Sequence, residues 1–266
     1  MSFSIAFLIA GTVYSDVPYA KVDQVRTKNR RLGLGLMGLH EWLLMHGKKY
    51  GPDPELEELL KVYASAADEA SRRYAGEWNL SCPKKNRSIA PNGTIAIVAE
   101  TTGGIEPLLC AAYKRRFLKG DLWSYQYVVD PTAKRIIDLT GIDPDQVEDA
   151  YSLAGDVERR VGFQAWVQKY VDHAISSTIN LPRWGSEQNN DDKVKPFGEM
   201  LLKHLPNLRG ITCYPDGARG GQPLTPVRYA TAMKHLGEEF TETGEQKVVL
   251  EQGDICDITK GGSCGV

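Results

Sequence analysis

The chain has 266 residues, of which 42% are hydrophobic and 25% charged, and its formal net charge is −2. This composition is typical of a globular protein with one large or two small domains. The near-neutral charge gives no electrostatic case for nucleic acid or an anionic membrane as the main partner. No apolar run reaches the ~20 residues that cross a bilayer. The five cysteines are scattered, which argues against a disulfide framework and favours a reducing cytoplasm.

The first part of the chain is predicted to be helical. The apolar run 3–14 has no basic segment before it, so we expect a buried helix there rather than a signal peptide. After the basic segment 21–31, leucines recur at helical spacing over 32–44. Asp53-Pro54 then combines a capping residue with a favourable first residue, which predicts the start of another helix.

The second part mixes helices with short strands, which predicts an α/β layer or barrel. Beyond Gly237 the chain is polar and glycine-rich, and we expect 237–266 to be a flexible C-terminal tail after a main body at 1–236. Strands are expected at 123–129, 178–181 and 208–214, the last ended by a turn at 215–217, and helices at 144–157, 158–175, 197–205 and 225–236.

Two patterns that can mark cofactor or metal sites are better explained structurally. The segment 33–38 fits Gly-x-Gly-x-x-Gly, but basic and polar residues stand where a dinucleotide site needs an apolar strand. A helix with small residues for close packing explains it better. The five histidines have no ligand spacing and no Cys-x-x-Cys occurs, so we expect no metal site.

Two glycine-bearing turns at 88–107 are the most informative local pattern. Asn92 and Gly93 both tolerate positive φ, so the chain can turn sharply there. Thr94 can then cap a helical turn whose free N–H groups suit a phosphate. On the local pattern alone, an ordinary capped loop explains these residues better than a phosphate site. Glu106, before Pro107, is either a buried carboxylate that orients backbone N–H groups or a solvated loop charge.

Three further candidates lie near the C-terminus. Cys256 and Cys264 are either a redox pair on a flexible segment, able to exchange with an active-site disulfide, or two ordinary exposed thiols. Arg219, in the glycine-rich segment 216–222, either binds an anionic group or belongs to a plain strand-end loop.

Five segments together, in this order, resemble those of ribonucleotide reductases, and most closely the adenosylcobalamin-dependent class II catalytic chain. The resemblance extends over about residues 20–230. Its segments are Arg30 to Leu39, Ala90 to Ile95, Gly104 to Pro107, Ala174 to Pro182 and Tyr214 to Arg219.

The resemblance implies a ten-stranded α/β barrel, of which this chain would form the C-terminal portion. It implies radical reduction of a ribonucleoside di- or triphosphate to the 2′-deoxyribonucleotide, with adenosylcobalamin as cofactor and a thioredoxin-like protein as reductant. It also assigns substrate-phosphate binding and a redox role to particular residues. Those matching the phosphate loop are Pro91, Asn92, Gly93, Thr94 and Ile95, and those resembling the C-terminal redox thiols are Cys256 and Cys264.

The chain also departs from the family pattern. The catalytic Asn-x-Cys-x-Glu segment is absent from these residues. We therefore expect the chain to be inactive until an N-terminal part of the barrel is supplied. Cys110 is expected to be a buried packing residue, and Cys213 interrupts a tyrosine pair of the tyrosine-radical type, which favours the cobalamin type. Two alternatives stay open: a non-catalytic half-barrel that serves assembly, and a tyrosine-radical reductase.

Overall fold

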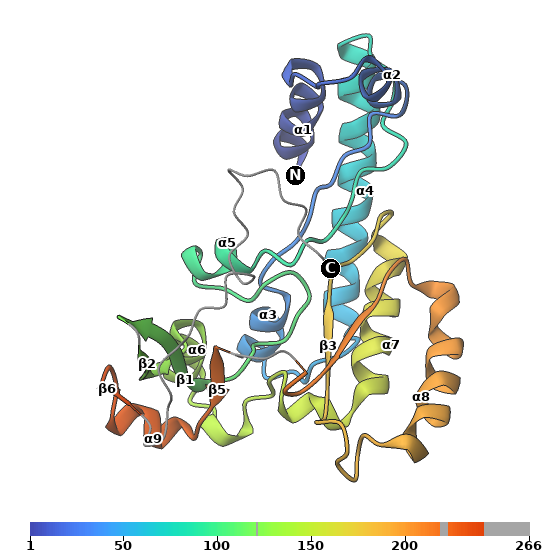
Figure 1. Cartoon of the computed structure of the whole chain (residues 1–266). Helices are drawn as coiled ribbons and strands as arrows, with labels where there is room; N and C mark the ends of the chain where they lie inside the picture. Colours follow the sequence, from blue (N-terminus) through green and yellow to red (C-terminus); the bar gives the residue numbers. More distant parts are fainter. Residues whose placement is uncertain (121, 219–222, 242–266) are drawn as a thin grey trace. The chain divides into compact units, whose positions relative to one another are not determined.

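The computed structural model describes residues 1–120, 122–218 and 223–241 (Figure 1). The chain divides into two compact units. The first comprises Met1–Ala111 and Asp130–Gly220, and the second Ala112–Val129 and Gly221–Val266. Each unit has its own sheet and is described by itself.

The first unit combines helices with short parallel strands, so the expected α/β class is confirmed. The longest helix, α4 (Pro54–Glu77), begins as predicted, because the Asp53 carboxylate accepts hydrogen bonds from the N–H groups of Glu55 and Leu56 at 2.9 and 3.1 Å. The other helices are α1 (Ser2–Tyr14), α2 (Ala20–Asn29), α3 (Leu39–Met45), α5 (Gly93–Val98), α6 (Pro131–Thr140), α7 (Val157–Val167) and α8 (Asp191–His204), and the strands are β3 (Thr178–Leu181) and β4 (Thr212–Pro215).

Four extended segments lie side by side and parallel in this unit. Leu34 pairs with Arg87, and Ile89 pairs with Ile175. Farther along the same segment, β3 pairs with β4 from Thr178↔Thr212 to Leu181↔Pro215. Within the described residues this run is open and does not close into a barrel.

The core of the first unit lies between these segments and the helices α3, α4 and α7. The three helices and the segments 86–89 and 175–181 each contribute almost fully buried side chains, so these two segments lie against a continuous apolar layer. Its members include Leu43, Leu60, Tyr63, Ile89, Ile105, Phe163, Val167 and Ile175.

The second unit is a small antiparallel sheet with one helix. Its strand order is β5-β1-β2-β6, and its core is formed by Ala112, Val129 and Ala232. The expected extended segment at 123–129 is confirmed as part of β2. The elements are β1 (Ala112–Lys119), β2 (Leu122–Val129), β5 (Leu224–Pro226), α9 (Tyr229–Lys234) and β6 (Glu239–Phe240).

Two segments that were expected to be helical are extended over part or all of their length, because they pair with neighbouring strands. Residues 33–38 are not a helix: Leu34 bridges to Arg87, and α3 starts only after Gly38, whose φ is +77°. Close packing does explain the small residues, since a Cβ on Gly35 would lie 2.8 Å from the Ser88 carbonyl oxygen. Likewise, the expected helix 225–236 is extended at its start, where β5 ends at Pro226, and its α-helix begins only at Tyr229.

Two other helices form only in part, because a side chain competes for the backbone. In 144–157, the Asp149 carboxylate accepts hydrogen bonds from the N–H groups of Tyr151 and Ser152 at 3.0 and 2.7 Å, so only two short 3₁₀ turns form. In 158–175, the Gln168 amide donates to the Val171 and His173 carbonyls, and the α-helix ends at Val167. The 3₁₀ turns of the first unit are η1 (Pro144–Gln146), η2 (Ser152–Gly155), η3 (Gln168–Tyr170) and η4 (Leu205–Asn207).

Beyond Gly237, Glu239–Phe240 pairs with β2, so the sheet extends past the expected start of the tail. Residues 242–266 lie outside the described part of the chain.

Candidate functional site

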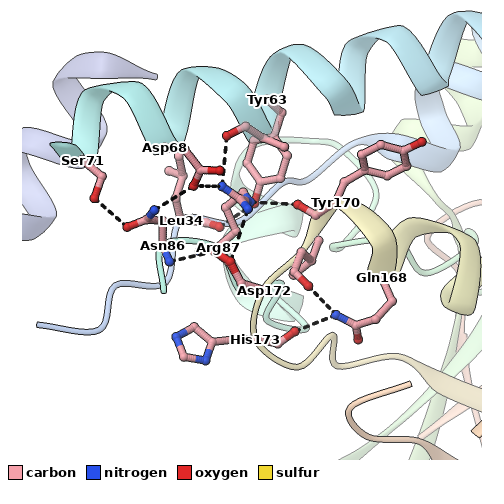
Figure 2. Close-up of polar contacts among 12 residues, drawn as sticks. Leu34, Tyr63, Asp68, Ser71, Asn86, Arg87, Gln168, Tyr170, Asp172 and His173 are labelled. Carbon is pink, nitrogen blue, oxygen red and sulfur yellow. Dashed lines mark hydrogen bonds and ion pairs between the residues drawn. The ribbon is translucent and has the colours of Figure 1, made fainter. Parts of the chain in front are cut away.

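The strand that leads into the loop 90–107 is held by a buried arginine (Figure 2). The Arg87 guanidinium pairs with Asp68 of α4 and with Asp172, the latter at 3.3 Å, and its Nε donates to the Tyr170 carbonyl at 2.8 Å. Asp172 also accepts the N–H groups of Asn86 and Arg87 at 2.8 and 3.1 Å. The direction in which the chain leaves the strand is therefore fixed by α4 and by the segment after α7.

The loop then turns sharply at Asn92, as predicted. Asn92 has a left-handed backbone, with φ +56°, and is followed directly by α5. The expected cap by Thr94 is wrong, because Asn92 occupies the cap position and Thr94 lies inside the helix without a side-chain cap bond. The first bond of the helix runs from Ala96 N–H to the Asn92 carbonyl at 2.7 Å. The N–H groups of Gly93, Thr94 and Ile95 consequently point out of the helix start with no capping side chain.

All five expected phosphate-loop residues come together at this helix start. Pro91, Gly93, Thr94 and Ile95 are exposed and Asn92 is half-buried, so a ligand can reach them. The positive end of a helix and its free donors favour a bound anion.

The second glycine turn packs directly against the first. A Cβ on Gly103 would lie 2.5 Å from the Pro91 carbonyl oxygen. Gly104 has φ +47°, and its Cβ would lie 2.8 Å from the Ala90 carbonyl oxygen. These approaches admit only glycine, so the second turn sets the backbone of the first.

Three polar groups anchor the second turn from the protein side. Of the two roles left open for Glu106, the structure favours the orienting one, because its half-buried carboxylate accepts the Thr178 N–H of β3 at 2.6 Å. The buried Tyr50 hydroxyl donates to the Ile105 carbonyl at 2.7 Å, and the Leu108 N–H donates to His40 Nδ1 at 2.9 Å. Sequence analysis missed His40 and Tyr50, because no local pattern links them to residues 105–108.

Burial of His40 gives the chain an acid-sensitive group. Desolvation lowers the pKa of His40 to about 3, with Arg160 and Arg159 adding to the effect and Glu148 opposing it. In the unfolded chain the imidazole takes up a proton below about pH 6.5, whereas in the folded chain His40 stays neutral until the pH falls to about 3. The contribution of neutral His40 to the free energy of unfolding is therefore fully present above about pH 6.5 and is lost as the pH falls from there towards 3.

We expect the free energy of unfolding to drop by about 2 to 3 kcal/mol between pH 7.5 and 4.5 through His40 alone. Urea unfolding at both pH values should give a smaller drop for His40→Gln than for the unchanged chain. Equal drops in the two proteins, or titration of the His40 ring above pH 5 in an NMR experiment, would contradict this assignment.

The cysteines do not form a redox site within the described residues. Cys110 is buried, as expected, and desolvation raises the pKa of its thiol to about 12. Cys213 is half-buried, with its pKa also raised by desolvation, and Cys82 is exposed. The candidates Cys256 and Cys264, and also Arg219, lie outside the described residues.

Two features are absent from the described residues. No helix there is both long and apolar enough to span a membrane. In the same residues, no three His, Cys, Asp or Glu side chains gather as a group able to hold a metal ion.

The part of the chain that carries this site is similar in sequence to one known family of proteins. Residues 85–204, which include the loop and both of its turns, match the ribonucleotide reductase barrel domain. The chain is 29% identical over 263 residues to a vitamin B12-dependent ribonucleoside-diphosphate reductase of Mycobacterium tuberculosis H37Rv, covering 86% of this chain and 36% of the relative. It is 26% identical to the enzyme of the same name from Thermoplasma acidophilum, covering 88% of this chain and 33% of that protein.

The chain is therefore a relative of the ribonucleotide reductases, with their barrel-domain sequence at 85–204. Among the reductases it is similar to the vitamin B12-dependent enzymes, so the predicted resemblance to that class is confirmed. The crystal structure of a B12-dependent class II ribonucleotide reductase shares the fold, with a TM-score of 0.69 over 88% of this chain at 16% identity. This chain covers 37% of that one.

Proposed function

We propose that the chain contributes part of the catalytic barrel of an adenosylcobalamin-dependent ribonucleotide reductase, and that Pro91–Ile95 bind the substrate phosphates. The observation that carries the proposal is the exposed start of α5, where a left-handed Asn92 leaves three N–H groups uncapped. It lies directly after a strand of the parallel run, within the segment that matches the reductase barrel domain.

The ten-stranded barrel is part of the same proposal. The parallel run formed by 32–34, 86–89, 175–181 and 212–215 is the kind of arrangement that an open part of a barrel would have. Its outer segments have edges to which further strands can add. An N-terminal part of the catalytic chain would supply those strands and the Asn-x-Cys-x-Glu segment, which these 266 residues lack.

The cofactor is assigned to the assembled enzyme. A hollow of about 710 Å³ beside α2 is lined by Tyr19, Val22 and Val25 together with basic side chains, and it has no carboxylate or histidine donor. We therefore do not assign the corrin to this hollow. When bound, adenosylcobalamin would supply the radical chemistry, and the residues of this chain would bind and orient the substrate.

The C-terminal thiols complete the proposal. Cys256 and Cys264 would exchange with an active-site disulfide and receive electrons from a thioredoxin-like reductant. Their separation along the chain leaves seven residues between them, several of them small or polar, which permits a loop to close.

Nucleotide binding tests the phosphate site, and turnover tests the partial-barrel proposal. We expect the chain to bind ribonucleoside di- and triphosphates at least about tenfold more tightly than the unphosphorylated nucleoside, because charge-assisted bonds to phosphate add roughly 1.5 to 3 kcal/mol. Calorimetric titration with each ligand measures this difference. Equal affinities would contradict the phosphate site.

The purified chain should show no turnover with adenosylcobalamin and a dithiol, and should gain it with a polypeptide that carries Asn-x-Cys-x-Glu. Turnover by the chain alone would refute the partial-barrel proposal. A complex that binds nucleotide but never turns over would favour the alternative of an assembly module. Activity without cobalamin would favour the tyrosine-radical type.

A further inference from the structure

The helix that carries the proposed phosphate site is weakly held by packing. Of the six residues of α5, only Ala96 is buried, while Ile97 and Val98 are 74% and 81% exposed. The free N–H groups at its start therefore keep their position only if the two ends of the helix are held.

A charged pair from two other helices holds the C-terminal end. Glu100, just after α5, has a left-handed backbone with φ +50°, and its carbonyl accepts Arg135 Nη2 of α6 at 2.6 Å. The same Nη2 donates to Glu41 Oε1 of α3 at 2.6 Å. The other oxygen of that carboxylate accepts the Thr101 hydroxyl.

Backbone bonds extend the contact by one residue. The Gly38 N–H donates to the Thr102 carbonyl at 2.8 Å, and the Glu41 N–H donates to the Thr102 hydroxyl at 3.2 Å. Thr101 in turn donates its N–H to the Ala96 carbonyl at 3.0 Å, which ties the contact to the last turn of α5. Glu41 is thus linked to α5 through Thr101 and Thr102.

We propose that Glu41 and Arg135 are positioning residues for the phosphate loop, with the pair acting through Glu100 and Thr101 to hold α5. This inference rests on the proposed function for its ligand, but its geometry stands without it. Arg135 is 41% exposed, so we expect this pair to contribute less to global stability than a pair buried on both sides, although Glu41 is only 17% exposed. Its effect is on where one short helix lies.

The test compares variants of neighbouring residues on α6. Arg135→Ala removes the donor shared by Glu41 and Glu100, whereas Lys134→Ala removes an exposed ion pair with Asp138. Hydrogen exchange of the full chain is measured over 93–101, together with affinity for a ribonucleoside triphosphate and the urea midpoint. For Arg135→Ala and Glu41→Ala we expect exchange about tenfold faster and affinity about tenfold weaker, with little change in the midpoint.

A conservative variant separates geometry from charge. In Glu41→Gln the side chain keeps an oxygen for Arg135, and its amide can donate to the Thr101 hydroxyl, so most of the protection should return. The positioning role is overturned if exchange over 93–101 is unchanged in Arg135→Ala, or if Lys134→Ala has the same effect. If Arg135→Ala speeds exchange over 93–101 but the unchanged chain binds no nucleotide, the positioning role is supported and the phosphate site is overturned.

Discussion

Replacement of Arg87 by methionine is expected to lower the free energy of unfolding by about 3 to 5 kcal/mol, the cost of breaking a buried ion pair by removing one partner. The guanidinium donates to the carbonyls of Ala64 and Tyr170 at 3.0 and 2.8 Å and pairs with Asp68 and Asp172 (Figure 2). The side chains of Arg87 and Asp172 are each only 10% exposed. Methionine fills most of the volume but leaves two carboxylates and two carbonyls without this donor.

Urea unfolding of the full chain measures this loss, with Arg73→Met as the control. Arg73 lies on the same helix as Asp68, and its ion pair with Glu77, at 3.5 Å, has both side chains more than half exposed. Its loss should cost less than about 1 kcal/mol. Arg87→Lys keeps the charge but not the planar fork, and should fall between the two. Equal costs for Arg87→Met and Arg73→Met would show that the network is not the main support of this strand.

Local signals predicted some elements because their causes lie within a few residues. Asp53-Pro54 starts α4 through its own carboxylate, and Asn92 supplies the left-handed turn before α5. Thr178–Leu181 was predicted as a strand and is β3. The sharp turn at residues 92–93 was predicted for the same reason, and residues 91–95 do meet at one helix start. Their phosphate-binding role came from the family resemblance and stays a prediction.

The remaining features depend on partners far along the chain. Leucines at 32–36 have helical spacing, yet this segment is extended because Leu34 pairs with Arg87, more than fifty residues away. The Asp143-Pro144 start was read correctly as a cap, but Asp149 diverts the backbone a few residues later. Glu41 and Arg135 are 94 residues apart, so no local pattern could join them. Pairings of this kind are settled only by the tertiary fold.

Glycine substitutions in the two turns of the loop should have opposite effects. Gly104→Ala is expected to cost about 2 to 5 kcal/mol, because a left-handed residue gains a Cβ and that Cβ meets backbone. The Cβ would lie 2.8 Å from the Ala90 carbonyl oxygen and 3.1 Å from Ile89 Cγ2, at φ +47°. Gly93→Ala has nothing within 4 Å and no positive φ, and alanine favours a helix by about 0.5 to 1 kcal/mol. Urea unfolding of both variants checks the contrast.

Nucleotide binding by the Gly93 variants then tests the site itself. The sequence suggests that Gly93→Val distorts the turn, but the open space around Gly93 removes that reason. Weaker binding must instead come from a side chain that keeps phosphate away from the N–H groups of α5. We therefore expect Gly93→Ala and Gly93→Val to weaken nucleoside triphosphate binding progressively without loss of stability. Unchanged affinity in a fully folded Gly93→Val chain would mean that phosphate does not approach this helix start.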